Sequence, residues 1–172
     1  GKLFEPYYKA LQSGNYMQKT VETRQVGGEA APYITTVYRN GDDAYIIKEE
    51  SYGAISEILI KDGYTYWFDK IAKTATRIQG TESLEAQRTL YEGEIQFVRN
   101  DVYNTFDDTY KCEVYSHGGE GEIWFCFNEF NELKNYRFYD AEKKDVITIG
   151  IEISLGTDGV SFSLPDGYEV IG

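Results

Sequence analysis

The chain has 172 residues and is strongly acidic, with 17 Lys and Arg against 29 Asp and Glu and a net charge of -12. A protein of this charge repels phosphate backbones and anionic membranes, so nucleic acid is not expected as a partner. The 41% apolar and 16% aromatic content excludes intrinsic disorder, and the length predicts a single domain spanning residues 1–172.

The first segment, "LFEPYYKALQSGN", has the pattern of an amphipathic helix. Phe4, Tyr7 or Tyr8, and Leu11 recur at helical spacing, and Gly14 follows as a stop signal. The sequence therefore predicts an N-terminal helix. The longest purely apolar run, Ile123 to Phe127, is far shorter than the roughly 18 residues of a spanning helix, so no transmembrane segment is expected.

From Asn15 to Gln79 the apolar period is two, which predicts a meander of about six strands. Turns are marked by Asn40-Gly41, Tyr52-Gly53 and Asp62-Gly63. If each turn contains two residues, one face collects the mainly apolar side chains and is predicted to be buried; an extra residue in any turn would exchange the faces. The predicted buried face consists of Ile34, Thr36, Tyr38, Tyr45, Ile47, Ile58, Ile60 and Trp67.

The opposite face of this meander is predicted to carry Tyr64, Tyr66 and Phe68 among charged residues. Cross-strand aromatic pairing is a sufficient structural reason for them. A row of exposed rings is also the platform that a sugar or a partner protein would need.

Between Gly80 and Phe106 the alternation fades, and apolar residues at loosely helical intervals predict a central helical insertion. Strands resume near Thr109. A hairpin about Gly119 would place Cys112 directly opposite Cys126, so a cross-strand disulfide is geometrically possible. Two buried free thiols are the alternative, and export from the cytoplasm would favour the bridge.

The last third of the chain predicts further strands. In "DVITIGIEISL", Ile147, Ile149 and Ile151 fall on one face, and the turn "AEKK" would set Phe138 against Ile147. A final strand is predicted over residues 160–164, before Pro165 interrupts the ladder. The predicted fold class is α+β: a curved antiparallel sheet or unclosed barrel of about 10–11 strands with helices on its concave face.

Catalytic chemistry has little support in the sequence. His117 is the only histidine and lies in a glycine-rich turn, which favours a solvated side chain over a catalytic base. Adjacent carboxylates such as Asp42-Asp43 point to opposite faces of a strand, and the calcium-loop and phosphate-loop patterns are absent. We therefore expect no catalytic residue, no metal site and no cofactor.

The order of elements resembles the LolA-like superfamily of bacterial lipoproteins and lipoprotein localisation factors. The resemblance is carried by "YITTVYRNGDDAYIIKE", "ILIKDGYTYWFDKIAKTATRI" and "VSFSLPDGYEVIG". It implies an unclosed barrel plugged by helices, with lipid or another apolar ligand between them. The ligand-binding residues that it implies are Tyr38, Tyr45, Ile47, Ile58, Ile60, Trp67, Ile147, Ile149 and Ile151.

The resemblance further implies an extracytoplasmic protein, lipid-anchored at the cell envelope through a residue upstream of Gly1. No arginine matches the one associated with lipoprotein transfer, which argues against carrier activity. The leading hypothesis is thus a non-enzymatic protein that binds an apolar molecule. Two alternatives stay open: the same isoleucines could form a dry core, and exposed aromatics could bind a glycan or a protein partner.

Overall fold

The computed structural model describes residues 1–81, 95–118, 121–140, 142 and 145–172. The chain opens with helix α1 (Glu5–Ser13), as predicted from its apolar spacing. Gly14 ends the helix in the left-handed conformation, with φ 71°, and donates its N–H to the carbonyl of Leu11. Glycine takes this conformation without the steric cost that a Cβ atom would add.

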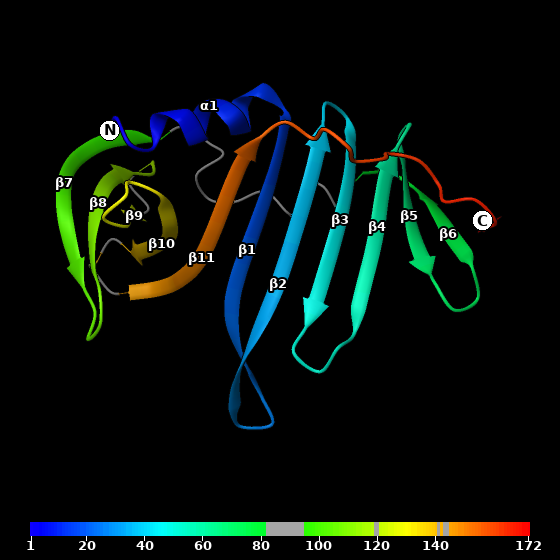
Figure 1. The fold of residues 1–172 in the computed structure, drawn as a ribbon, viewed down its shortest axis with the longest axis horizontal. Coiled ribbons are helices and arrows are strands. Elements are labelled where there is room, and N and C mark those ends of the chain that lie inside the picture. Colours follow the sequence, from blue (N-terminus) through cyan, green and yellow to red (C-terminus); the bar gives the residue numbers. More distant parts are fainter. Residues whose placement is uncertain (82–94, 119–120, 141, 143–144) are drawn as a thin grey trace.

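The rest of the described chain forms one sheet of twelve strands in the order β12-β6-β5-β4-β3-β2-β1-β11-β10-β9-β8-β7. Neighbouring strands are antiparallel except β12 and β6, which are parallel. The sheet is curved and unclosed (Figure 1), so the predicted unclosed antiparallel sheet is confirmed with one strand more than expected. The bounds are β1 (Asn15–Val26), β2 (Glu29–Asn40), β3 (Asp43–Glu50), β4 (Ile55–Lys61), β5 (Tyr64–Asp69), β6 (Thr74–Gln79), β7 (Gln96–Asn104), β8 (Thr109–Ser116), β9 (Gly121–Phe127), β10 (Leu133–Asp140), β11 (Asp145–Leu155) and β12 (Glu169–Ile171).

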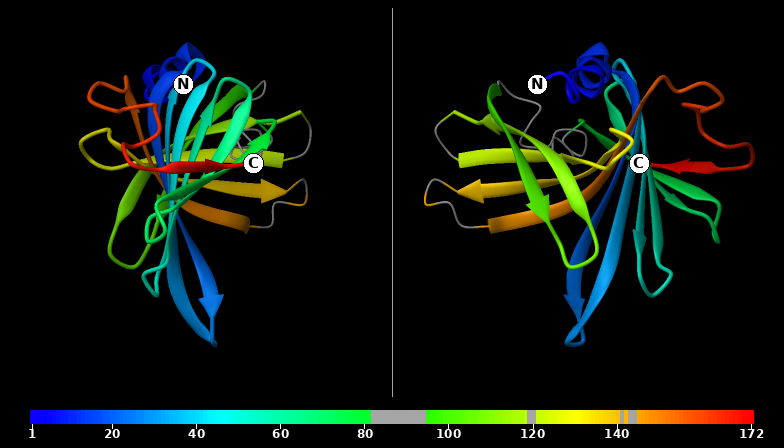
Figure 2. Two further views of the ribbon diagram at one scale, coloured as in Figure 1. Left: turned by 90° about the vertical axis from the view of Figure 1, so that its right-hand side faces the viewer. Right: turned by 60° about the vertical axis from the view of Figure 1, so that its left-hand side comes forward.

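Helix α1 and the C-terminal segment, residues 156–168, lie on opposite sides of the sheet (Figure 2). We call the side that carries α1 the concave face and the other side the convex face. The predicted strand at 160–164 is wrong: these residues cross the convex face without strand structure, and only Glu169–Ile171 pairs, along β6. Pro165 lacks the N–H that a ladder needs, which is one reason why the strand begins after it.

The turn between β4 and β5 matches its sequence signal. Lys61 pairs with Tyr64, so Asp62 and Gly63 form a two-residue turn with φ angles of 53° and 81°. Positive φ at both positions is the geometry that Asp-Gly favours, and its twist matches that of the strands. Ile58, Ile60 and Trp67 therefore share one face, as predicted.

The turn between β3 and β4 holds one residue more than expected. Glu50 donates its N–H to the carbonyl of Ala54, which leaves Ser51, Tyr52 and Gly53 as the loop. Ile46 rather than Ile47 then pairs with Ile58. Because one extra residue reverses the facing of a strand, the prediction that the β2 and β3 residues share a face with Ile58 is wrong. The residues so displaced to the convex face are Ile34, Thr36, Tyr38, Tyr45 and Ile47.

The central helical insertion is also corrected in part. Residues 96–104 form strand β7, not a helix, and pair along β8. The remainder of the predicted insertion, residues 82–94, lies outside the described residues. The helical spacing of Val98 and Val102 is equally compatible with a strand that carries a bulge, and the register shifts between Phe97 and Arg99.

In the described part of the chain, two buried clusters occupy the concave face. The first lies beneath α1, where the Phe4 ring stacks on Phe125 with centroids 3.6 Å apart. We call it the helix-packed cluster; besides these rings it contains Ala10, Leu11, Tyr16, Tyr115, Ile123, Phe127, Leu133, Tyr136, Ile151 and Ile153. The second, which we call the aliphatic row, consists of Val37, Ala44, Ile46, Ile58 and Ile60.

Candidate functional site

The aliphatic row runs across the strands rather than along one of them. Val37 pairs with Ile46, Ile46 with Ile58, and Ile58 with Trp67, so four consecutive strands contribute to one line. With about 4.8 Å between neighbouring strands, the line is roughly 14 Å long. Ala44 and Ile60 pair beside it and widen the apolar surface. These five side chains are at most 3% exposed, so the row is buried in this structure, and the open apolar area on this face lies beside it, at Trp67.

Burial changes along the row. Ile46, Ile58 and Ile60 have no exposed surface, whereas Trp67 is 39% exposed and Ile78, on the same face of β6, is 53% exposed. Sequence reasoning expected Trp67 to face inward with the isoleucines; it lies on their face, but at the rim. The apolar side chains of this face are therefore buried on β2–β4 and exposed to solvent on β5–β6.

Polar groups on the same face are satisfied or lie at the boundary. Thr65, which pairs with Ile60, donates its hydroxyl to the carbonyl of Gly80 at 2.8 Å. Gln18 is 4% exposed and pairs with Val37 on one side and Ile153 on the other. Because Gln18 stands between the two clusters, it divides the concave face into two apolar areas.

Two further predicted ligand residues on this face, Ile149 and Ile151, lie at the helix-packed cluster. Ile151 is 5% exposed within it, and Ile149 packs against it. Ile147 pairs through its backbone with Phe138, as predicted, and Ile149 pairs with Tyr136. The structure thus separates Ile149 and Ile151 from Ile58 and Ile60, although the sequence grouped all four.

Tyr38, Tyr45 and Ile47 line a hollow of about 380 Å³ on the convex face, beneath the C-terminal segment. Its other wall is Val160, Ser161, Ser163 and Pro165. The Tyr45 hydroxyl donates to Glu57 at 2.6 Å, and burial, then this bond, raises the pKa of Tyr45 far above its ordinary value. The hollow therefore presents neutral rings and hydroxyls.

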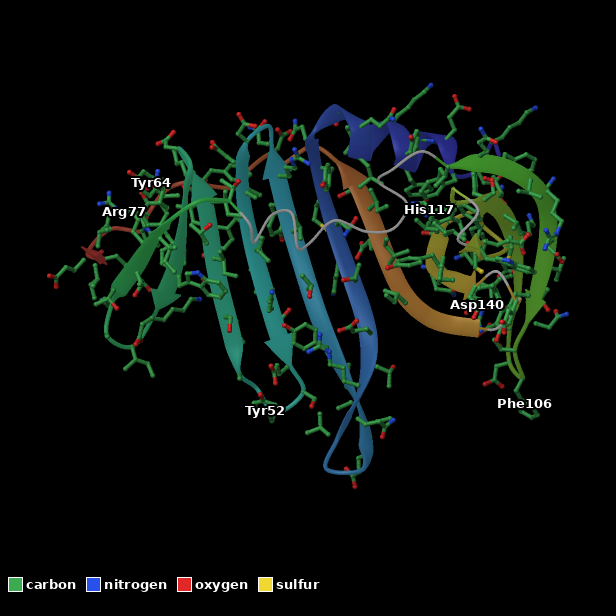
Figure 3. All side chains as sticks on the ribbon, turned by 180° about the vertical axis from the view of Figure 1, so that it is seen from behind. Tyr52, Tyr64, Arg77, Phe106, His117 and Asp140 are labelled. Atoms are coloured by element: carbon green, nitrogen blue, oxygen red, sulfur yellow. The ribbon has the colours of Figure 1, made fainter. Side chains whose placement is uncertain are left out.

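The convex aromatic residues are half-buried rather than free. Phe68 lies between Tyr45, at 6.1 Å, and Tyr168, at 5.6 Å. Tyr64 packs on Tyr66 and carries the Arg77 guanidinium 4.8 Å from its ring; Figure 3 shows Tyr64 and Arg77 together at the β5–β6 end. Phe68 is therefore held by the fold, while the other two rings remain partly accessible.

A buried carboxylate was missed by sequence reasoning. Glu113 is 3% exposed and accepts the backbone N–H groups of Leu3 and Phe4, each at 2.9 Å. It also accepts the Tyr115 hydroxyl at 3.2 Å; burial and the nearby Glu113 carboxylate raise the pKa of Tyr115. Glu113 fixes the start of α1 on the sheet. Only the register, which sets its carboxylate on the concave face, could have indicated this role.

The cysteines lie directly opposite each other, as predicted. Both are buried, with their sulfur atoms 3.1 Å apart and no disulfide between them in this structure; the choice between thiols and a bridge stays a prediction. Hydrogen bonding to Cys112 and burial raise the pKa of Cys126. Arg137, from β10, reaches the Tyr103 ring of β7 at 3.9 Å. Because β8 and β9 lie between them, this contact passes over the strands that carry the cysteines.

Among the described residues, no group of three or more His, Cys, Asp or Glu side chains is arranged to hold a metal ion. His117 lies at the end of β8 (Figure 3), where its backbone N–H donates to the carbonyl of Gly121. Over the same described part of the chain, α1 is too short to cross a membrane, and no helix has the length and apolarity that crossing requires.

No protein-family model matches the chain, and no curated protein matches it in sequence. Similar solved structures include an uncharacterized conserved protein from Thermus thermophilus, at 10% identity and TM-score 0.47, covering 99% of this chain and 96% of that chain. A LolA superfamily protein from Nitrosomonas europaea is 12% identical with TM-score 0.40, covering 89% of this chain and 90% of that chain. MucB of Pseudomonas aeruginosa, solved in complex with MucA, is 8% identical with TM-score 0.46, covering 92% of this chain and 58% of that chain. All three TM-scores are below 0.5, so the chemistry of the site rests on this chain's own residues.

Proposed function

We propose that the protein is a non-enzymatic, extracytoplasmic binding protein that holds an apolar molecule of the lipid acyl class on the aliphatic row. The observation that carries the proposal is a continuous apolar line across four strands, made by the aliphatic row on β2–β4 and the half-exposed Trp67 on β5. Aliphatic side chains contribute to binding in proportion to the apolar area that they remove from water. The row itself is buried in this structure, so the proposal requires the ligand to enter beside Trp67 and Ile78, where apolar side chains are exposed.

The position of the two tryptophans gives a direct test. Trp67 lies at the rim of the row, whereas Trp124 pairs with Arg137 and Val114 on the convex side of the other half of the sheet. A dibrominated stearic acid methyl ester, which quenches indole fluorescence on contact, should quench a Trp124→Phe variant, in which Trp67 is the emitter. It should leave a Trp67→Phe variant, in which Trp124 emits, largely unquenched. Equal quenching of the two variants, or none in either, would refute the site.

Native mass spectrometry of the purified protein complements this experiment. A copurifying acyl compound that is lost from an Ile58→Glu variant would support the row as its location, because a charge there penalises apolar contact. A Lys19→Glu variant introduces the same carboxylate at a half-buried position on the convex face of β1 and serves as the control. An identical copurifying compound in both variants would place the ligand elsewhere.

The convex hollow supports a second candidate function. Its tyrosine rings and serine hydroxyls suit a saccharide, since sugars combine apolar C–H faces with hydroxyl groups. Glycan binding there should be abolished by Tyr38→Ala and unaffected by Trp67→Phe, because Trp67 lies on the other face. Array binding followed by isothermal titration of any hit measures the difference, and binding lost equally in both variants would exclude the hollow.

A further inference from the structure

Among the strands that the structure describes, β7 forms one end of the sheet and has a neighbour, β8, on one side only (Figure 1). Its apolar side chains are unusually open: Val98 is 47% exposed and Val102 is 53% exposed. Free edges of this kind offer a row of backbone donors and acceptors to another strand. At the opposite end of the sheet, the three-residue strand β12 pairs along β6.

The hydrogen bonds of β7 show which of its residues direct their backbone N–H and C=O groups away from β8. The N–H of Val102 donates to the Asp101 carboxylate at 2.8 Å instead of to β8. At the hairpin, the N–H of Thr105 donates across the turn to the carbonyl of Asp108. Since alternate residues of an antiparallel strand direct their backbone groups to opposite sides, Asn100 and Val102 direct theirs outward.

The sequence of β7 is complementary in charge to a second copy of itself that runs antiparallel. Residues 98–102 read Val-Arg-Asn-Asp-Val, with a valine at each end and opposite charges on either side of Asn100. We propose that β7 pairs antiparallel with β7 of a second copy of this chain, about a two-fold axis at Asn100. Such an interface is isologous: Arg99 of each copy lies opposite Asp101 of the other, and Val98 lies opposite Val102.

The charges select this register over its neighbours. A residue whose backbone groups point away from β8 must pair with a residue of the second copy whose backbone groups do the same. The two-fold axis can therefore lie at Arg99, Asn100 or Asp101. An axis at Arg99 sets two arginines directly opposite each other, and an axis at Asp101 sets two aspartates opposite. Like charges at such positions destabilise a sheet, whereas the axis at Asn100 gives two attractive pairs.

Little rearrangement is needed to form the pair. Arg99 holds Glu122 at 2.8 Å and Asp101 at 3.2 Å within its own chain, and the first of these contacts can persist. Asp101 releases the N–H of Val102, which then donates to the second copy. The bulge at Val98 limits the regular ladder to residues 98–102, well below a standard interface of about 1,600 Å². We therefore expect a weak dimer, with Kd on the order of 0.1 mM.

Charge-reversal variants, measured singly and mixed, test the pairing of β7 with β7. Sedimentation equilibrium of the wild type from roughly 10 μM to 1 mM should show dimers, and Arg99→Glu or Asp101→Arg should each weaken them by about 10-fold or more. An equimolar mixture of the two variants should associate again, because the introduced carboxylate of one variant then lies opposite the introduced guanidinium of the other. A wild type that stays monomeric throughout, or single variants that associate like the wild type, would overturn the proposal.

A cross-link keeps the proposal testable if Arg99→Glu disturbs the Glu122 contact and the fold. In the proposed register the two Asn100 Cα atoms lie about 5.5 Å apart, within the range of a disulfide. Asn100→Cys should form covalent dimers in glutathione disulfide, which accepts the two electrons. Gln96→Cys, exposed on the same strand but far from the axis, is the matched control. Equal cross-linking of both variants would contradict the register.

Discussion

The two halves of the concave face bury different kinds of apolar side chain. Beneath α1 the sheet is covered by interlocking rings, with Phe4 stacked on Phe125 and Tyr115 edge-on to both. On β2–β5 the surface is a single aliphatic row that ends at a half-exposed tryptophan. The rings beneath α1 form a filled layer, whereas the proposed function assigns ligand binding to the aliphatic row.

The largest effect should come from removing the centre of the helix-packed cluster. Phe125→Ala deletes a fully buried ring that contacts Phe4, Tyr115 and Tyr136, and should lower the free energy of unfolding by about 3–5 kcal/mol. Chemical denaturation measures this loss. Phe106→Ala, on a ring that projects into solvent at the β7–β8 hairpin (Figure 3), should change stability by no more than about 0.5 kcal/mol.

The aliphatic row should respond less strongly if it is the adaptable half. Ile58→Ala is expected to cost about 2–3 kcal/mol in ligand-free protein, at the low end of the range for buried isoleucine. A loss as large as that of Phe125→Ala would mean that the row is packed as tightly as the helix-packed cluster. That result would favour the dry-core alternative.

Glu113 ties α1 to its half of the sheet, so its charge should matter next. Glu113→Gln keeps the size of the side chain but weakens two backbone hydrogen bonds, and should cost about 1–3 kcal/mol. Hydrogen exchange should then increase in α1 more than in β2–β5. Glu5→Gln removes a carboxylate from an exposed ion pair with Lys9 and should cost at most about 0.5 kcal/mol.

The smallest change in stability is expected at the rim of the row. Trp67→Ala should lower the free energy of unfolding by about 1–2 kcal/mol, less than for a fully buried tryptophan, because 39% of the residue is already exposed. Its effect on binding of the brominated ester should be much larger. A large loss of stability with unchanged binding would show that Trp67 is a core residue.

Most of the fold follows from local signals in the sequence. Helical spacing before Gly14, Asp62-Gly63 at a two-residue turn, and the opposed cysteines all predicted elements or registers correctly. The resemblance also predicted an unclosed sheet. These features depend on neighbours in the chain or on one hairpin, so they can be derived without knowledge of distant contacts.

The candidate site was predicted only in part. The face on which the side chains of a strand lie depends on the length of every preceding turn, so an error in one turn carries over to the other strands. One additional residue in the loop after Glu50 moved Tyr38, Tyr45 and Ile47 to the convex face, and no propensity distinguishes a two-residue loop from a three-residue loop at Tyr52-Gly53. Glu113 was missed for a related reason. Its partners Leu3 and Phe4 are more than a hundred residues away in sequence.

The short strand at the chain's end has a consequence for assembly. β12 covers the outer side of β6 with a strand of three residues, so this end of the sheet offers a shorter edge than the nine residues of β7. A chain truncated after Tyr168 would lack β12 and would expose β6 as a second unpaired edge strand, in addition to β7. We expect the truncated chain to associate through both sheet edges into fibres, and an increase in light scattering would reveal them.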